Sequence, residues 1–190
     1  MKPNRSAQKT RRIAFSAILS ALCVLVLYVG SFFDSLDLTF AALSTLFIAF
    51  AVLEMGHPWD ILIYAVSSLL SVLLLPSKFA AVVFTLFLGF YPIAKLFFER
   101  LRPLWAWLLK ISLFNTCFLI VLAVCRFVLG LGSEETVDVL LFVIGNVAFL
   151  AYDFFLSAIT TLYTVKFRRR LRIARFFGDP KVDKHDEEEV

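Results

Sequence analysis

Long apolar stretches alternate with short polar breaks along almost the whole chain. A helix that crosses a bilayer needs about 20 mainly apolar residues, with a range of about 17–25. The pattern predicts six membrane-spanning helices, at residues 13–33, 38–55, 59–75, 79–98, 104–130 and 137–165. The breaks hold glycine, proline or clustered charges, which end helices. Very short breaks after the second and third stretches predict two tight helical hairpins.

The composition leaves little of the chain for a soluble domain. Of the 190 residues, 61% are hydrophobic and 18% are charged, whereas soluble domains have about 45–50% and about 25%. We therefore predict an all-α integral membrane protein, a bundle of six transmembrane helices at 13–165. A basic tail (1–12) precedes the bundle, and a tail that is first basic and then acidic (166–190) follows it. The first apolar run is too long for a signal peptide and lacks an A-x-A-like cleavage site, so we expect an uncleaved helix.

Basic residues gather in three segments, namely the N-terminal tail, the link between the fourth and fifth spans, and the C-terminal tail. With six spans these segments share one side, which the positive-inside rule makes cytoplasmic. The opposite loops carry mainly acidic residues. We therefore predict that both termini are cytoplasmic and that the formal net charge of +4 reflects membrane topology. The expected partner of this charge is the lipid bilayer, and no nucleic acid is expected.

Polar residues of the last span line up on one face of the predicted helix. At about 100° per residue, Asp153, Ser157, Thr160 and Thr164 all lie within about 40° of Asn146. A charge at the bilayer centre costs about 2.5–3.5 kcal/mol, so this stripe is expected to face protein or water. Asp153 is either a ligand contact or an interhelical hydrogen-bonding group.

The fourth and fifth spans carry polar faces as well. Asn115 and Arg126 lie eleven residues apart and share one face of the fifth span, while Tyr91 and Lys95 share one side of the fourth. In a bundle these faces turn inward. Asn115 or Tyr91 is the expected neighbour of Asp153.

Four charged residues lie close to the predicted cytoplasmic boundary of the fourth and fifth spans. We expect their long side chains to extend toward the lipid headgroups. They are Lys95, Glu99, Arg102 and Lys110. Within the same region Pro92 predicts a kink, because its ring clashes with the preceding turn and it has no N–H to donate.

No known catalytic motif is present. The chain lacks HExxH, GxSxG and a glycine-rich phosphate loop, and its two histidines lie in a turn and a tail. We predict no enzymatic activity and no cofactor, so active transport needs energy from a partner or an ion gradient. Glu54, His57 and Asp60 could together hold a metal, but a solvated hairpin turn is the favoured interpretation. Three cysteines in apolar stretches are expected to be buried thiols.

The first span carries alanines on one face, at positions 14, 17 and 21. Ala17 and Ala21 form a small-xxx-small pair, which lets another helix approach closely. This face either packs inside the bundle or receives a separate membrane protein.

A basic tail, an alanine-bearing first span and six short spans with both ends inside resemble the substrate-binding S components of energy-coupling factor transporters. The resemblance implies a subunit of the bacterial cell membrane that captures a small micronutrient from the outer face. It implies two kinds of protein partner, a coupling membrane subunit and two cytoplasmic ATPases. Ala14, Ala17 and Ala21 then form the docking surface.

The resemblance also implies where the ligand lies, near the outer face among the last three spans. Arg126, Asn146 and Asp34 are expected to approach the ligand, with Asp153 at the floor of its cavity and the loop at 30–40 as a lid. Asn115 and Tyr91 complete the set of candidate contacts. The chain also resembles the MreD type of six-span proteins in the bacterial cell-shape machinery. In that alternative it is a scaffold without a ligand, and its polar stripe joins helices.

Overall fold

The computed structural model describes residues 5–33, 36–99, 102–127 and 139–167. Within these ranges all regular elements are helical, which confirms the all-α prediction. In chain order the elements are α1 (Arg5–Gly30), α2 (Asp37–Glu54), α3 (Trp59–Leu74), α4 (Lys78–Val83), the π-helix η1 (Phe84–Leu88), α5 (Tyr91–Phe98), α6 (Pro103–Phe127), α7 (Val139–Leu162) and the π-helix η2 (Tyr163–Phe167).

Five helical segments are long and apolar enough to cross a membrane. They are Lys9–Gly30, Asp37–Glu54, Lys78–Phe98, Pro103–Cys125 and Phe142–Val165. Each coincides with a predicted span. The third predicted span is the apolar helix α3, which has 16 residues. At 1.5 Å per residue it is about 24 Å long, somewhat less than the roughly 30 Å of a hydrocarbon core. The count of six spans therefore stays a prediction.

The two predicted hairpins form where turn-favouring residues interrupt the apolar pattern. Gly56 ends α2 with a φ of 62°, a left-handed conformation that glycine adopts without a steric penalty. Its N–H donates to the carbonyl of Ala51 at 3.1 Å, which satisfies a carbonyl at the helix end. After α3, the Ser77 side chain accepts a hydrogen bond from the N–H of Ala80 and caps α4.

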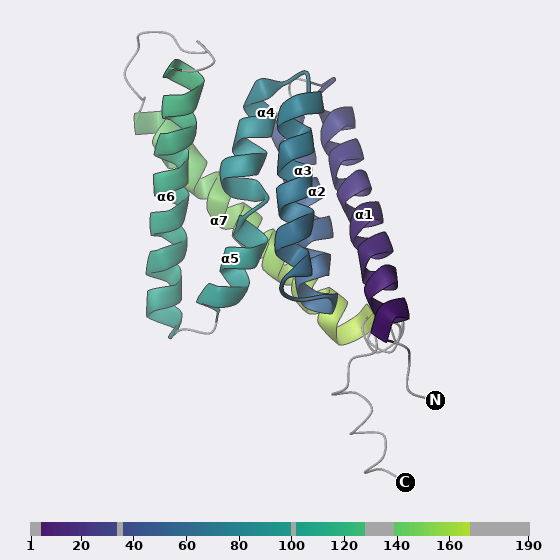
Figure 1. Ribbon diagram of the computed structural model, residues 1–190. Helices are drawn as coiled ribbons and strands as arrows, with labels where there is room; N and C mark the ends of the chain where they lie inside the picture. Colours follow the sequence, from purple (N-terminus) through teal and green to yellow (C-terminus); the bar gives the residue numbers. More distant parts are fainter. Residues whose placement is uncertain (1–4, 34–35, 100–101, 128–138, 168–190) are drawn as a thin grey trace.

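The helices form two groups that meet at α2 and α3 (Figure 1). One group consists of α1, α2 and α3, which pack against one another. The other consists of the segment α4–η1–α5 with α6 and α7. In Figure 1, α6 stands at the side of the bundle away from α1, and α7 crosses obliquely behind the other helices. α2 contacts both groups, because it packs on α1 and α3 and also on α4, η1, α5 and α7.

The start of α1, the end of α5, the start of α6 and the end of η2 lie at the same end of the bundle (Figure 1). We call it the basic end, since the three basic segments of the sequence adjoin it. The other end is called the opposite end.

The fourth span is broken near its middle, as Pro92 predicts. α4 passes into η1, where the N–H of Gly89 donates to the carbonyl of Phe84 at 2.7 Å. α5 then begins at Tyr91, so that Pro92 lies in its first turn, where a missing N–H is tolerated. The break separates α4 from a short helix that carries Tyr91 and Lys95 on one face.

Candidate functional site

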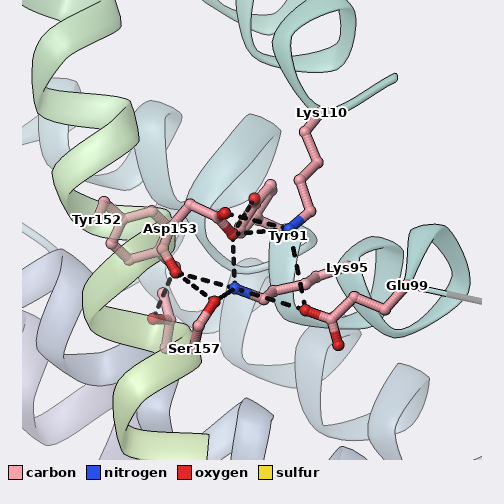
Figure 2. A network of polar contacts seen from close by, with 8 residues as sticks. Tyr91, Lys95, Glu99, Lys110, Tyr152, Asp153 and Ser157 are labelled. Atoms are coloured by element: carbon pink, nitrogen blue, oxygen red, sulfur yellow. Dashed lines mark hydrogen bonds and ion pairs between the residues drawn. The ribbon is translucent and has the colours of Figure 1, made fainter. Parts of the chain in front are cut away.

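Asp153 lies on α7 and faces α5 and α6 (Figure 2). Its carboxylate accepts a hydrogen bond from the Tyr91 hydroxyl at 2.6 Å and one from the Lys95 ammonium at 2.5 Å. Lys110 reaches both carboxylate oxygens, at 3.1 and 3.3 Å. Only 6% of the Asp153 side chain is exposed. The carboxylate is therefore satisfied from two other helices.

Lys95 joins the same centre by further hydrogen bonds. Its ammonium donates to the backbone carbonyl of Asp153 at 2.9 Å and to the Ser157 hydroxyl at 2.5 Å. Glu99 lies at the edge, with one carboxylate oxygen 3.8 Å from the nitrogens of both Lys95 and Lys110. Half of its side chain, 49%, is exposed. We call Tyr91, Lys95, Glu99, Lys110, Asp153 and Ser157 the ion-pair network.

Helical spacing explains why these residues meet. Tyr91, Lys95 and Glu99 follow one another at intervals of four on α5, which places them on one face. Asp153 and Ser157 have the same interval on α7. A straight continuation of α4 would turn the α5 face differently, so the break at η1 contributes to this arrangement.

Two of the four charged residues expected at the headgroups are instead buried. The side chains of Lys95 and Lys110 are 5% and 9% exposed. The expectation was wrong for them because Asp153 supplies a buried counter-charge, and the hydrogen bonds that both lysines donate to it offset part of the cost of removing them from water. Arg102 and Glu99 are both exposed.

An aromatic layer lies beside the ion-pair network, toward the opposite end. Phe114 and Phe149 stack with ring centroids 4.6 Å apart and an interplanar angle of 9°. Phe87 packs edge-on against both, at 5.3 and 5.7 Å, and Tyr91 and Tyr152 extend the cluster. These rings come from η1, α5, α6 and α7, so the layer closes the space where those helices meet.

A second polar pair lies beyond this layer. The side-chain amide of Asn146 donates to the side-chain oxygen of Asn115 at 3.1 Å and to the carbonyl of Phe142 at 2.9 Å. Asn146 precedes Asp153 by seven residues, about 10 Å along the helix. Phe149 lies between them on α7. The polar stripe is therefore divided into an asparagine pair and an ion-pair network.

The residues that the sequence predicted to contact a ligand lie in different parts of the structure. Tyr91 is a neighbour of Asp153, as expected, whereas Asn115 pairs with Asn146 instead. Asp34 lies outside the described residues, and so does the side chain of Arg126, although its backbone belongs to α6. Further down the stripe, the Thr164 hydroxyl of η2 donates to the carbonyl of Thr160 in the last turn of α7 at 2.8 Å.

Helix α1 turns its alanines away from the bundle. Ala14, Ala17 and Ala21 are all exposed, while Leu19, Cys23 and Leu27 are buried against the neighbouring helices. Packing inside this chain therefore does not account for the alanine face. Cys117 and Cys125 are also buried, which confirms the expectation for all three thiols.

At the basic end His57 and Asp60 pair at 2.7 Å. Asp60 is buried and also accepts from the N–H of Ile61, so this turn is less solvated than expected. Nowhere in the described ranges do three His, Cys, Asp or Glu side chains come together as metal ligands would.

The network is suited to holding charge and helices in place. It consists of two ammonium groups, two carboxylates, one of them half exposed, and the hydroxyls of Tyr91 and Ser157.

No protein-family model matches the sequence, and no curated protein or solved structure shows significant similarity to it.

Proposed function

We propose that this protein is the substrate-binding membrane subunit of an energy-coupling factor type importer in a bacterial cell membrane. It captures a small micronutrient from the outer face and passes it on with the help of a coupling membrane subunit and two cytoplasmic ATPases. The observation that carries the proposal is the exposed face of Ala14, Ala17 and Ala21 on α1. Side chains this small let a helix of another protein approach closely.

The position of the alanine face along α1 supports a partner that is linked to the cytoplasm. By the positive-inside rule, the basic end of the bundle is cytoplasmic. Of the three alanines, Ala14 lies in the half of α1 that is nearer this end, Ala17 close to the middle and Ala21 beyond it, since α1 runs from Arg5 to Gly30. A coupling subunit bound there is within reach of ATPases on the cytoplasmic side.

The ligand site of this proposal lies toward the opposite end. Asn115 and Asn146 present amide groups there, which can both donate and accept hydrogen bonds. The aromatic layer forms the floor of the site. Arg126 and Asp34 are proposed to complete it. Asp153 lies on the cytoplasmic side of that floor, where it braces α5, α6 and α7 and supports the site indirectly.

Affinity purification from native membranes in a gentle detergent, followed by mass spectrometry, tests the proposal. The wild-type protein is expected to bring along two ATPases and one further membrane protein. Ala17→Trp is expected to lose them while the chain stays folded, because the indole fills the space a partner helix needs. Ala123→Trp is the matched control, since Ala123 is an exposed alanine on α6. Equal recovery of partners with both variants contradicts the docking role of α1.

A second candidate function is a membrane scaffold of the cell-shape machinery. It is favoured by the satisfied carboxylate of Asp153, whose oxygens bond to Tyr91, Lys95 and Lys110 as structural groups do. The same purification separates the two candidates. Cell-wall or cell-shape proteins in place of ATPases support the scaffold.

A further inference from the structure

The buried charges of the ion-pair network do not balance. Lys95, Lys110 and Asp153 are all buried, which leaves one positive charge in excess. Among the described residues, the ion pairs of the two lysines go to Asp153 and Glu99. Burying an unpaired charge is costly, so an anion beside the lysines would stabilise the excess charge.

Glu99 balances the excess positive charge of the two lysines only in part. Its carboxylate lies 3.8 Å from both ammonium nitrogens, beyond the roughly 2.7–2.9 Å of a charge-assisted hydrogen bond. An ammonium group has three N–H donors. The hydrogen bonds of Lys110 go to the two oxygens of Asp153, so this ammonium can serve a further acceptor. Since 49% of the Glu99 side chain is exposed, another anion can replace it from outside.

The residues around Glu99 are typical of the lipid headgroup region of a membrane. Glu99 follows the last residue of α5 at the basic end, and α6 begins four residues later at Pro103. Trp105 and Trp107 are exposed near the start of α6, and the Lys110 ammonium lies 5.8 Å from the Trp107 ring. Tryptophan is enriched at membrane interfaces. Exposed apolar side chains nearby, such as Phe97, offer a surface for acyl chains.

We propose that Lys95 and Lys110 bind a phosphate group with one negative charge at the position that Glu99 now occupies, and that an anionic phospholipid of the leaflet at the basic end supplies it. Basic pockets between membrane helices on the cytoplasmic side bind anionic headgroups in this way. The inference does not depend on the proposed transport function, because it rests on the charge balance of three buried side chains and on Glu99.

Native mass spectrometry of the full-length protein in mild detergent tests this site. The probes are phosphatidylglycerol and phosphatidylcholine with the same acyl chains, and inorganic phosphate in a third arm. Wild type is expected to bind phosphatidylglycerol more tightly than phosphatidylcholine by about fivefold or more, the effect of one favourable charge near the surface.

Two variants change the charge at the site in opposite directions. Glu99→Gln removes the competing carboxylate and is expected to tighten phosphatidylglycerol binding by up to about fivefold, the range of an exposed ion pair. Its control, Glu187→Gln, removes the same charge from the C-terminal tail. Lys110→Gln removes the excess positive charge and is expected to reduce the preference for phosphatidylglycerol by about fivefold. Its control is Lys78→Gln, at an exposed lysine near the opposite end.

Equal binding of the two lipids by wild type overturns the proposal, and so does a Glu99→Gln variant that binds like Glu187→Gln. If Lys110→Gln fails to fold, the comparison of Glu99→Gln with Glu187→Gln decides alone. If inorganic phosphate competes with phosphatidylglycerol in wild type but not in Lys110→Gln, the result supports a phosphate site that a free anion can also fill. If inorganic phosphate competes equally well in Lys110→Gln and in wild type, the result contradicts the phosphate site.

Discussion

Replacing Asp153 with asparagine tests whether the ion-pair network holds the bundle together. The substitution keeps the size of the side chain but removes its negative charge. Lys95 and Lys110 then lie side by side among α5, α6 and α7, with only the half-exposed Glu99 as a counter-charge, 3.8 Å from each ammonium nitrogen. The hydroxyl of Tyr91 also loses an ionised acceptor.

The expected loss of stability is large. Removing one partner of a buried ion pair costs about 3–5 kcal/mol, since the remaining charge stays buried and uncompensated. Folded domains are stable by only about 5–15 kcal/mol in total. We therefore expect Asp153→Asn to lower the free energy of unfolding by about 3–5 kcal/mol. If Asp153 were a ligand contact, which the sequence leaves open, the variant would lose ligand binding rather than stability, but the number of contacts to the carboxylate favours the structural effect.

Reversible denaturant unfolding of the purified protein in mixed micelles, followed by circular dichroism, measures this change. Ser157→Ala is the matched control on the same face of α7. It removes a hydroxyl that accepts from Lys95 but leaves the charges in place, so it is expected to cost about 1 kcal/mol. Adding Lys95→Met to Asp153→Asn removes one of the two uncompensated lysines. The double variant is therefore expected to be more stable than the sum of the two single effects predicts, by about 0.5–3 kcal/mol.

An Asp153→Asn variant that is as stable as Ser157→Ala would show that the ion-pair network does not hold the bundle together. Strict additivity in the double variant would show the same, because the effects of Asp153 and Lys95 on stability would then be independent.

Three further substitutions probe the layers of the interior separately, by the same unfolding measurement. Tyr91→Phe deletes a hydrogen bond to a charged acceptor and is expected to cost about 1.5–3 kcal/mol; no loss would mean that the bond does not form. Asn146→Leu breaks the pair with Asn115 and is expected to cost only about 0.6–1.7 kcal/mol, as interhelical hydrogen bonds in membranes do, and a larger loss would assign this pair a structural role. Phe149→Ala opens the aromatic layer and is expected to cost about 3–5 kcal/mol; a smaller loss would show that the rings are not closely packed.

The helical architecture could be predicted from the sequence because it follows from local signals. Apolar runs of membrane length, glycine and proline at the breaks, and Pro92 in the fourth span each act over a few residues. Five spans and the interruption near Pro92 agree with the structure. The third predicted span, 59–75, agrees with α3 to within one residue, and Pro76 and the cap at Ser77 follow its end as the break in the apolar pattern indicates.

The chemistry of the interior was harder to predict because it depends on which helices meet. The stripe on the last span and its neighbour Tyr91 could be found by helical periodicity. The roles of Lys95 and Lys110 could not, since a lysine near a span end usually extends to the headgroups, and only the tertiary position of Asp153 reverses that preference. One signal was present in the sequence, namely that a carboxylate deep in a span requires a cation somewhere in the bundle.

The most direct test of the proposed function is a photo-crosslinking amino acid placed at position 17, activated in native membranes, with mass spectrometry of the adduct. A single membrane protein is expected to be crosslinked to α1, and two ATPases are expected to co-purify with this adduct. Adducts with lipid alone, or with proteins of the cell-shape machinery, would contradict the proposal that the alanine face of α1 docks a transporter's coupling subunit.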